Sequence, residues 1–403
     1  MALKNSPDKS EAIGELLSLL RIEGVTGKEH AISEAVVRSL KEAGVAEEKV
    51  LIDRVNQKIP QPTESGNVLV RFPGTRKGPR LLFSTHMDTV PLCAGAEPVL
   101  KGKKITPKGK TALGGDNRTG VAVLLFLVRK LIRSKILHLP ITFLFTVREE
   151  SGLLGARYLN PEDLGRPEMG FNVDGKTPNE ITIGAVGAER FEVEIFGKAS
   201  HAGVHPDEGI SSTLVAAEAL AKVHASGWFG KITKPQGQGT SNIGIFSGKN
   251  LQSAGDATNV VTDYVYLKGE ARSHDSKFTR LICKEYNAAF QWASRQVKNK
   301  HQEKARVRFQ SSMEYHPFRL KEDAPVVQYA QEKAAGMGLK PELKIGNGGL
   351  DANWLVRHGI PTITFGAGQN KIHTLDEFVD VEEFWKGCQF ALALATHSNP
   401  VSE

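Results

Sequence analysis

The sequence predicts an α/β protein with a mostly parallel central sheet, flanking helices and a second, inserted domain. Strand patterns alternate with helical patterns up to residue 183 and again after residue 319, which is typical of a parallel sheet. Between them, strands such as 190–197 alternate apolar and polar residues, as in a sheet with one solvated face. The 403 residues also exceed the size at which one hydrophobic core stops growing. We therefore expect one domain over 1–183 and 319–403, and another over 184–318.

The first domain begins with two amphipathic helices, the second of which stops at Gly44. Residues 80–90 form an almost wholly apolar strand until His86, which indicates a central strand covered on both faces. A glycine loop then opens a long apolar helix over 114–134. The other expected elements are helices at 11–20, 30–44, 324–338 and 381–398, strands at 67–72, 139–150, 168–175 and 361–366, and a Gly- and Lys-rich hairpin region.

The inserted region predicts the element order β-α-β-β-α-β. This order forms a compact ferredoxin-like sheet with its helices on one face. Such a sheet is self-contained, so we expect the region to fold as a separate domain. The expected strands lie at 190–197, 240–248, 260–273 and 305–316, and the helices at 209–226 and 277–297.

The net charge of +7 raises the question of nucleic-acid binding. The lysines and arginines are dispersed, and most lie among acidic residues. The two basic clusters, 74–80 and 296–308, are not interleaved with aromatic residues as a base-stacking surface would be. We therefore expect solvated surface and no nucleic-acid partner.

Three cysteines, far apart and without CxxC spacing, fit a reducing compartment. The sequence has no run of about 18 apolar residues, and charged residues interrupt the first helix where a signal peptide would be continuously apolar. We therefore expect a cytoplasmic protein with no membrane partner.

Acidic and histidine side chains fall at the ends of the expected core strands or in the loops that follow them. Ligands of open α/β sheets collect at these carboxyl ends. Taken singly, each residue has an ordinary explanation, such as a helix cap, a turn residue, a hydrogen-bonded histidine or a solvated Glu-Glu pair. Their shared position at strand ends favours a site instead. The residues are His86, Asp88, Asp116, Glu149, Glu150, Asp174 and His373.

Two short patterns indicate the chemistry of this site. His86 and Asp88 are two residues apart and share one face of a strand, so Asp88 can accept the second imidazole N–H and fix which nitrogen meets a metal. The adjacent Glu149 and Glu150 point to opposite faces, so one can hold a metal while the other handles a proton. Oxygen and imidazole donors without thiolate suit Zn²⁺, and Co²⁺ and Mn²⁺ remain open.

Seven motifs resemble those of the di-metal exopeptidase and aminoacylase superfamily, above all its peptidase T-like branch of tripeptide aminopeptidases. They occur in the family's order and approximate spacing, and the resemblance runs from about residue 10 to residue 390. The motifs are "STHMDTVP", "GGDNRTGVAVLL", "VREESGLLGARYL", "NVDG", "GKASHAG", "GGLDAN" and "HTLDEFV". Within "GGDNRTG", Asn117 and Arg118 stand where related sequences commonly carry other polar pairs.

The resemblance implies a di-zinc metallopeptidase that hydrolyses short peptides with a metal-activated water. His86 and Asp174 would hold one ion, Glu150 and His373 the other, and Asp116 would bridge them. Glu149 would be the general base, and a cis peptide bond would follow Asp116. The alternative within the same superfamily is an N-acyl amino-acid amidohydrolase or a carboxypeptidase.

The resemblance also implies substrate contacts. In the inserted domain, His201 would stabilise the oxyanion, Arg272 would clamp a terminal carboxylate and Asn259 would hydrogen-bond substrate. Gly348 and Gly349 would let the backbone approach the substrate pocket. Ordinary turn or surface roles remain open for His201, Arg272, Gly348 and Gly349. The inserted domain is a lid or dimerisation domain in this superfamily, which makes a homodimer through it possible.

Overall fold

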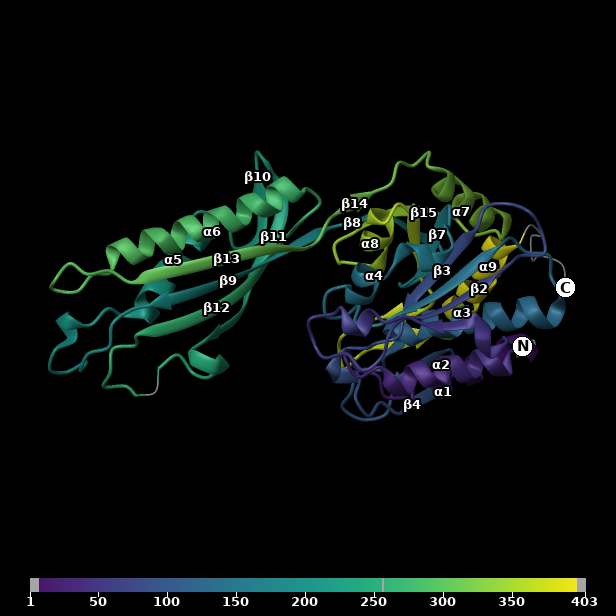
Figure 1. The fold of residues 1–403 in the computed structure, drawn as a ribbon, viewed down its shortest axis with the longest axis horizontal. Coiled ribbons are helices and arrows are strands. Elements are labelled where there is room, and N and C mark those ends of the chain that lie inside the picture. The colour runs from purple at the N-terminus through teal and green to yellow at the C-terminus, as the bar shows by residue number, and fades with distance from the viewer. Residues whose placement is uncertain (1–6, 256, 397–403) are drawn as a thin grey trace. The chain divides into compact units, whose positions relative to one another are not determined.

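The computed structural model describes residues 7–255 and 257–396 (Figure 1). The chain divides into two compact units. Unit 1 comprises Met1–Ala185 and Arg319–Glu403, and unit 2 comprises Val186–Phe318.

Within the described part of unit 1, a nine-stranded sheet has the order β1-β2-β6-β3-β7-β16-β8-β14, and β15 pairs with β8. Strand β3 is parallel to both β6 and β7, and β7 is parallel to β16, while β1 and β2 form an antiparallel edge. The predicted α/β class with a mostly parallel sheet is confirmed. The strands are β1 Val50–Ile52, β2 Val68–Phe72, β3 Leu81–His86, β6 Ile141–Thr146, β7 Met169–Val173, β8 Glu180–Ala185, β14 Phe318–Arg319, β15 Glu342–Gly346 and β16 Thr362–Phe365.

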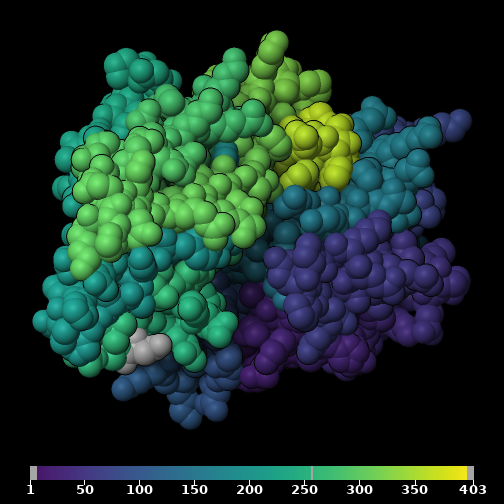
Figure 2. All heavy atoms as spheres, turned by 60° about the vertical axis from the view of Figure 1, so that its left-hand side comes forward, coloured from purple at the N-terminus to yellow at the C-terminus, as the bar shows by residue number. Residues whose placement is uncertain are grey.

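Helices cover both faces of this sheet because its central strands are apolar on both sides. In β3, Leu81 and Phe83 join the larger core, whereas Leu82 faces the opposite cluster. Helices α3 Gly115–Ser134, α7 Pro325–Gly336 and α9 Val381–Ala395 pack on the first face, and α4 Leu154–Tyr158 and α8 Asp351–Arg357 on the second. Helices α1 Pro7–Leu19 and α2 His30–Glu42 pack against α3, α2 also contacts β2, and their purple atoms form part of the surface in Figure 2.

A small second sheet of unit 1 has the order β17-β18-β5-β4. Strands β4 Pro98–Lys101 and β5 Lys104–Pro107 form the expected hairpin, and Val379 of β18 pairs with Ile105 of β5. Strands β17 Gln369–Asn370 and β18 Phe378–Asp380 flank the loop that carries His373. The small sheet therefore fixes both ends of that loop.

Unit 2 is an antiparallel sheet with two helices. Its order is β10-β11-β12-β9-β13, formed by β9 Gly187–Phe196, β10 Gly230–Lys234, β11 Gly237–Ser247, β12 Tyr264–Ser273 and β13 Arg306–Tyr315. Helices α5 Ser212–Ala225 and α6 Ser276–Gln296 pack together over β9 and β12, around the buried rings of Phe191, Tyr286 and Phe290. The predicted β-α-β-β-α-β order is present, and β10 is an additional strand.

Short 3₁₀ helices occupy Glu47–Lys49, Val55–Gln57, Pro91–Cys93, Pro161–Leu164, Pro206–Glu208 and Lys249–Leu251. The last two residues of the helix expected over 381–398 lie outside the described residues, and α9 ends at Ala395. Across residues 7–255 and 257–396, no helix combines the length and apolar character that a bilayer crossing requires.

Candidate metal centre

Three neighbouring parallel strands, β6, β3 and β7, end at one edge of the unit 1 sheet. His86 is the last residue of β3, Asp174 directly follows β7, and Glu149 and Glu150 follow the end of β6. Parallel pairing places the carboxyl ends of these strands together, so the sequence-predicted residues arrive at one place.

Asp116 reaches the same edge from the first turn of α3. The turn is irregular: Gly114 has φ +80°, the backbone at Asp116 is not helical, and the peptide bond to Asn117 is cis, which confirms the cis bond expected there. Further along the helix, a Cβ at Gly120 would lie 2.5 Å from the carbonyl oxygen of Val173. The glycine therefore lets α3 approach the end of β7 closely, which carries Asp116 towards Asp174.

His373 comes from the loop between β17 and β18, where its backbone has φ +61°. Its Nε2 lies 3.1 Å from Oδ2 of Asp116 and 3.0 Å from Oε2 of Glu150. The side chain remains 46% exposed, whereas that of His86 is 2% exposed. The centre is therefore deep on the His86 side and open to solvent on the His373 side.

Potential ligand atoms form two groups that share Asp116. His86, Asp116 and Asp174 form the first group, and Asp116, Glu150 and His373 form the second; each group offers ligand atoms within 4.8 Å of one another. Nε2 of His86 lies 3.1 Å from Oδ1 of Asp116, while His373 faces Oδ2 of the same carboxylate. One carboxylate thus directs one oxygen to each histidine, as a bridging ligand would.

These atoms fit a pair of divalent cations. Zinc binds imidazole nitrogen and carboxylate oxygen at roughly 2.0–2.2 Å, so two of its ligands lie about 3.3 Å apart in a tetrahedral site. The 3.0–3.1 Å separations around Asp116 and His373 are close to this spacing. The donor set contains carboxylates and imidazoles and no thiolate.

The electrostatics of the centre also fit cations. Burial, together with neighbouring carboxylates, raises the pKa of Asp174 to about 8 and the pKa of Glu150 to about 7. Burial likewise raises the pKa of Glu149 well above its ordinary value. Concentrated buried negative charge is costly without compensation, and divalent cations would supply that compensation.

Glu149 lies beside both groups but belongs to neither. Its Oε2 is 3.9 Å from Nε2 of His86, and the residue is 8% exposed. A carboxylate next to a metal pair and outside its ligand set is free to exchange a proton with a bound water.

Asp88 makes more contacts than the sequence indicated. Nδ1 of His86 lies 3.0 Å from the carbonyl oxygen of Asp88 and 3.4 Å from its Oδ1. A carbonyl oxygen only accepts, so Nδ1 is the donor in this contact, and Nε2 is the ring nitrogen that faces Asp116. The Asp88 carboxylate also accepts the backbone N–H groups of Glu149, at 2.9 Å, and Glu150, at 3.1 Å.

Sequence reasoning missed three buried residues around the centre. Glu377 binds the Asp116 turn, and Asp351 accepts a hydrogen bond from the Thr146 hydroxyl at the end of β6. Glu377 and Asp351 lie inside the quoted motifs "HTLDEFV" and "GGLDAN", so an acid in each motif was the available signal.

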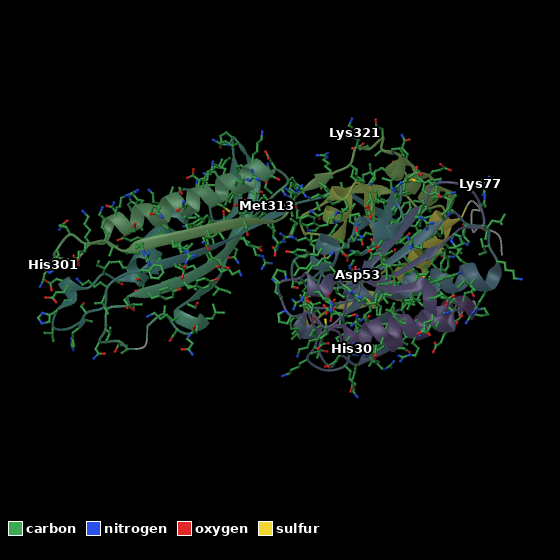
Figure 3. The ribbon with its side chains drawn as sticks, in the orientation of Figure 1. His30, Asp53, Lys77, His301, Met313 and Lys321 are labelled. Carbon is green, nitrogen blue, oxygen red and sulfur yellow. The ribbon has the colours of Figure 1, made fainter. Side chains whose placement is uncertain are left out.

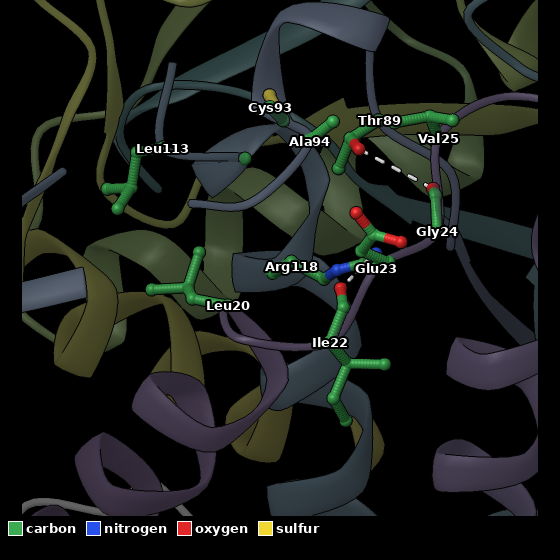
Figure 4. Close-up of a pocket in the computed structure, with 11 residues that line it drawn as sticks. Leu20, Ile22, Glu23, Gly24, Val25, Thr89, Cys93, Ala94, Leu113 and Arg118 are labelled. Atoms are coloured by element: carbon green, nitrogen blue, oxygen red, sulfur yellow. Dashed lines mark hydrogen bonds between the residues drawn. The ribbon is translucent and has the colours of Figure 1, made fainter. Parts of the chain in front are cut away.

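The third missed residue, Arg118, was noted only as a departure from related sequences. It is 1% exposed, and its guanidinium donates to the carbonyl oxygens of Met87 and Ile22. Figure 4 shows this guanidinium beside a small pocket lined by Thr89 and Cys93 among others. Because Met87 lies between His86 and Asp88, Arg118 supports the strand end that presents both.

The predicted contacts of unit 2 occupy two places. His201 and Asn259 lie on adjoining segments, since His201 bridges to Val260 and the N–H of Ala202 donates to Asn259 O at 2.8 Å. Nδ1 of His201 accepts the N–H groups of Gly203 and Val204, which leaves the proton on Nε2 of the neutral ring.

Arg272, the other unit 2 residue, is on β12 and pairs with Glu270 through two hydrogen bonds of 2.9 and 3.2 Å. In unit 1, Gly348 and Gly349 lie in the loop between β15 and α8, where Gly348 is exposed and Gly349 is half-buried. A Cβ at Gly348 would meet no atom within 4 Å, so local packing does not require glycine there.

Comparison with known proteins agrees with this architecture. The model of peptidase family M20/M25/M40 matches residues 82–397. The chain is 31% identical to an uncharacterized protein, YqjE, of Bacillus subtilis (strain 168), over 96% of this chain and 98% of the relative. It is 24% identical to peptidase T of Escherichia coli (strain K12), over 83% of this chain and 86% of the relative.

Two solved structures are similar along almost the whole length. A tripeptidase from Staphylococcus aureus subsp. aureus Mu50 has a TM-score of 0.85 and 28% identity, covering 96% of this chain and 98% of that one. The aminopeptidase PepT from Bacillus cereus ATCC 10987 has a TM-score of 0.80 and 30% identity, with the same coverage. The chain therefore belongs to peptidase family M20/M25/M40, and its relatives include peptidase T-like enzymes.

Proposed function

We propose that the protein is a two-metal exopeptidase that removes the N-terminal residue from short peptides, as a tripeptidase of the peptidase T type. The observation that carries the proposal is the pair of ligand groups that share Asp116, with Glu149 beside them and outside both. The similarity to the Staphylococcus tripeptidase and to the Bacillus PepT supports the substrate class.

His86 and Asp174 would hold one cation, Glu150 and His373 the second, and Asp116 both. Zn²⁺ suits these donors best, and Co²⁺ and Mn²⁺ are the other candidates. When bound, the cations supply Lewis-acid polarisation of the scissile carbonyl and lower the pKa of water at the site. Asp88 would hold the His86 ring in the tautomer that leaves Nε2 free for a metal.

Glu149 would accept the proton of the attacking water and pass it to the nitrogen of the leaving amine. Its low exposure suits this role because burial favours the protonated carboxyl group, which must form and then release the proton in each turnover.

The remaining predicted residues would contact the substrate. His201 would donate from Nε2 to the oxyanion, a role supported by the tautomer that its Nδ1 contacts select. Asn259 would hydrogen-bond the substrate from the adjoining segment. Arg272 would clamp the terminal carboxylate while sharing its guanidinium with Glu270. The open space at Gly348 would admit the peptide backbone, and its neighbour Gly349 would let the backbone approach closely.

We also propose a cytoplasmic homodimer that does not bind nucleic acid. All three cysteines are free and buried, which suits a reducing compartment. Strand β10 pairs with β11 only as far as Ser241, and beyond it Phe246 is 49% exposed, so part of β11 offers an edge for a second copy. Nitrogen- and oxygen-tipped side chains are interspersed on both units in Figure 3, and Lys300 of the basic cluster near His301 pairs with Glu208.

A substrate panel tests the activity. We expect the chain, loaded with Zn²⁺, Co²⁺ or Mn²⁺, to cleave tripeptides faster than dipeptides or N-acyl amino acids. Preferential hydrolysis of N-acyl amino acids, or release of C-terminal residues, would favour the amidohydrolase or carboxypeptidase alternative.

The substitution Glu149→Gln tests the proposed base. We expect it to lower kcat by several orders of magnitude while the metal content stays at two ions per chain. The exposed Glu168→Gln is the matched control and should leave kcat unchanged. Retained activity in Glu149→Gln would remove Glu149 from the reaction.

A further inference from the structure

The loop that carries Glu149 and Glu150 has an unusual set of backbone contacts. Four consecutive N–H groups, those of residues 147 to 150, donate to buried side-chain oxygens. The pairs are Val147 N to Asn67 Oδ1 at 3.1 Å, Arg148 N to Glu29 Oε1 at 3.2 Å, Glu149 N to Asp88 Oδ1 at 2.9 Å and Glu150 N to Asp88 Oδ2 at 3.1 Å.

The three acceptors come from distant parts of the sequence. Glu29 directly precedes α2, Asn67 directly precedes β2 and Asp88 follows β3, and each is 0% exposed. In most loops such N–H groups are hydrogen-bonded to water. Polar side chains that are fully buried are nearly always hydrogen-bonded within the protein. We call these three side chains the acceptor cradle.

Asn67 is itself held firmly in the cradle. Its backbone N–H and its Nδ2 both donate to the carboxylate of Asp53, at 2.8 Å each, and Nδ2 also donates to the carbonyl oxygen of Gly155 at 3.1 Å. Asp53, labelled in Figure 3, directly follows the edge strand β1. These bonds fix the side-chain amide so that its oxygen faces Val147.

Glu29 fixes the next residue. Its Oε1 also accepts the N–H of Gly27 at 2.6 Å, so the carboxylate is anchored within its own segment. Arg148 has φ +52°, a left-handed conformation that is unfavourable for a residue with a side chain. A bond from its N–H to an anchored, buried oxygen holds the backbone in that conformation, which turns the following two side chains towards the centre.

We propose that Glu29 and Asn67 are positioning residues that, together with Asp88, fix the backbone from which the general base and a ligand of the second metal project. The inference rests on the proposed function for the roles of Glu149 and Glu150. Glu29 and Asn67 thus act on the metal centre from a distance, through the backbone of residues 147–150.

Hydrogen exchange tests the cradle without using activity. In the full chain, with and without Zn²⁺, we expect the amides of a peptide covering 145–152 to exchange slowly for a loop. Glu29→Ala and Asn67→Ala should each speed exchange in this peptide by about tenfold or more. Glu29→Gln keeps an oxygen that can accept both N–H groups, and it should stay within about threefold of the parent chain.

Asn299→Ala is the matched control. Asn299 is a buried amide of unit 2 that accepts the N–H of Glu303 at 2.9 Å and donates to the carbonyl oxygen of Glu208 at 3.1 Å, as Asn67 does in unit 1. It should leave exchange over 145–152 unchanged. Exchange at the unprotected rate in the parent chain, or no change in either cradle variant, would overturn the proposal.

Metal binding supplies the second measurement. We expect Glu29→Ala and Asn67→Ala to weaken binding of one of two Zn²⁺ equivalents by about 10–100-fold and to lower kcat with little change in KM. Glu29→Gln should restore both. Equal losses in Asn299→Ala would indicate general destabilisation and would sink the proposal. If the parent chain bound no metal, the proposed function would be wrong. The exchange measurement would still show whether the acceptor cradle holds the 147–150 backbone.

Discussion

The carboxylate of Glu377 accepts the backbone N–H of Asp116 at 3.1 Å. It also accepts those of Leu113 and Gly114, at 2.7 and 2.9 Å, and is 1% exposed. Glu377 lies four residues after His373 in the loop between β17 and β18. One buried side chain therefore joins the turn that supplies the shared carboxylate to the loop that supplies the exposed histidine.

Substitution of Glu377 should weaken metal binding. Glu377→Ala removes the acceptor of three buried N–H groups, so the Asp116 turn loses its fixed position, and we expect about 10–100-fold weaker Zn²⁺ affinity by calorimetry. Asp376→Ala, at a neighbouring exposed acid of the same loop, is the control and should bind as the parent chain does. Unchanged affinity in Glu377→Ala would exclude this role.

Asp351 should influence the pH profile. It is 1% exposed, and its negative charge contributes to the raised pKa of Glu149, which burial raises most. Asp351→Asn keeps an oxygen for the Thr146 hydroxyl but removes the charge, so the pKa of Glu149 should fall. The acidic limb of kcat/KM should therefore move to lower pH. The exposed Asp323→Asn should leave that limb in place, and a shift to higher pH in Asp351→Asn would contradict the argument.

The metal-free protein should lose stability as pH rises. In the fold, the pKa of Asp174 is raised to about 8 and that of Glu150 to about 7, mainly by burial. The folded state therefore binds more protons than the unfolded state between about pH 4 and pH 8, and stability declines through this window. We expect a lower Tm for chelator-treated protein at pH 8 than at pH 5.5. Asp174→Asn should flatten this dependence, and a rising Tm would contradict it.

Arg118 should contribute strongly to stability. Arg118→Ala leaves the carbonyl oxygens of Met87 and Ile22 without their donor and opens a void, so we expect a loss of about 3 kcal/mol in urea unfolding. Arg133→Ala, at a 55% exposed arginine of the same helix paired with Glu11, should cost no more than about 1 kcal/mol. Similar losses in the free energy of unfolding for both variants would show that the buried contacts of Arg118 do not contribute to stability.

The strand-end residues could be predicted because the carboxyl ends of neighbouring parallel strands lie at the same edge of a sheet. Once 80–90, 139–150 and 168–175 were identified as buried strands, topology alone brought His86 and Asp174 to one edge of the sheet. The apolar runs of these strands are long enough to identify without a structure.

Strand β10 and the contacts of Glu29 and Asn67 could not be predicted, because their sequence patterns are too weak. Strand β10 has five residues, of which only Ile232 is buried. One buried position does not make the alternating pattern by which a strand is predicted. Glu29 and Asn67 resemble an ordinary helix-start acid and a strand-start amide, since their partners lie 119 and 80 residues away in the chain. Such contacts depend on tertiary structure, and spacing within a motif cannot reveal them.

Because Asp116 directs one oxygen towards each histidine, the two halves of the centre share one ligand, and binding at one half should affect binding at the other. The first ion to arrive would fix the rotamer of the common carboxylate and so prepare the place of the second. Titration with Zn²⁺ should consequently show positive cooperativity, and Asp116→Ala should abolish both binding events together.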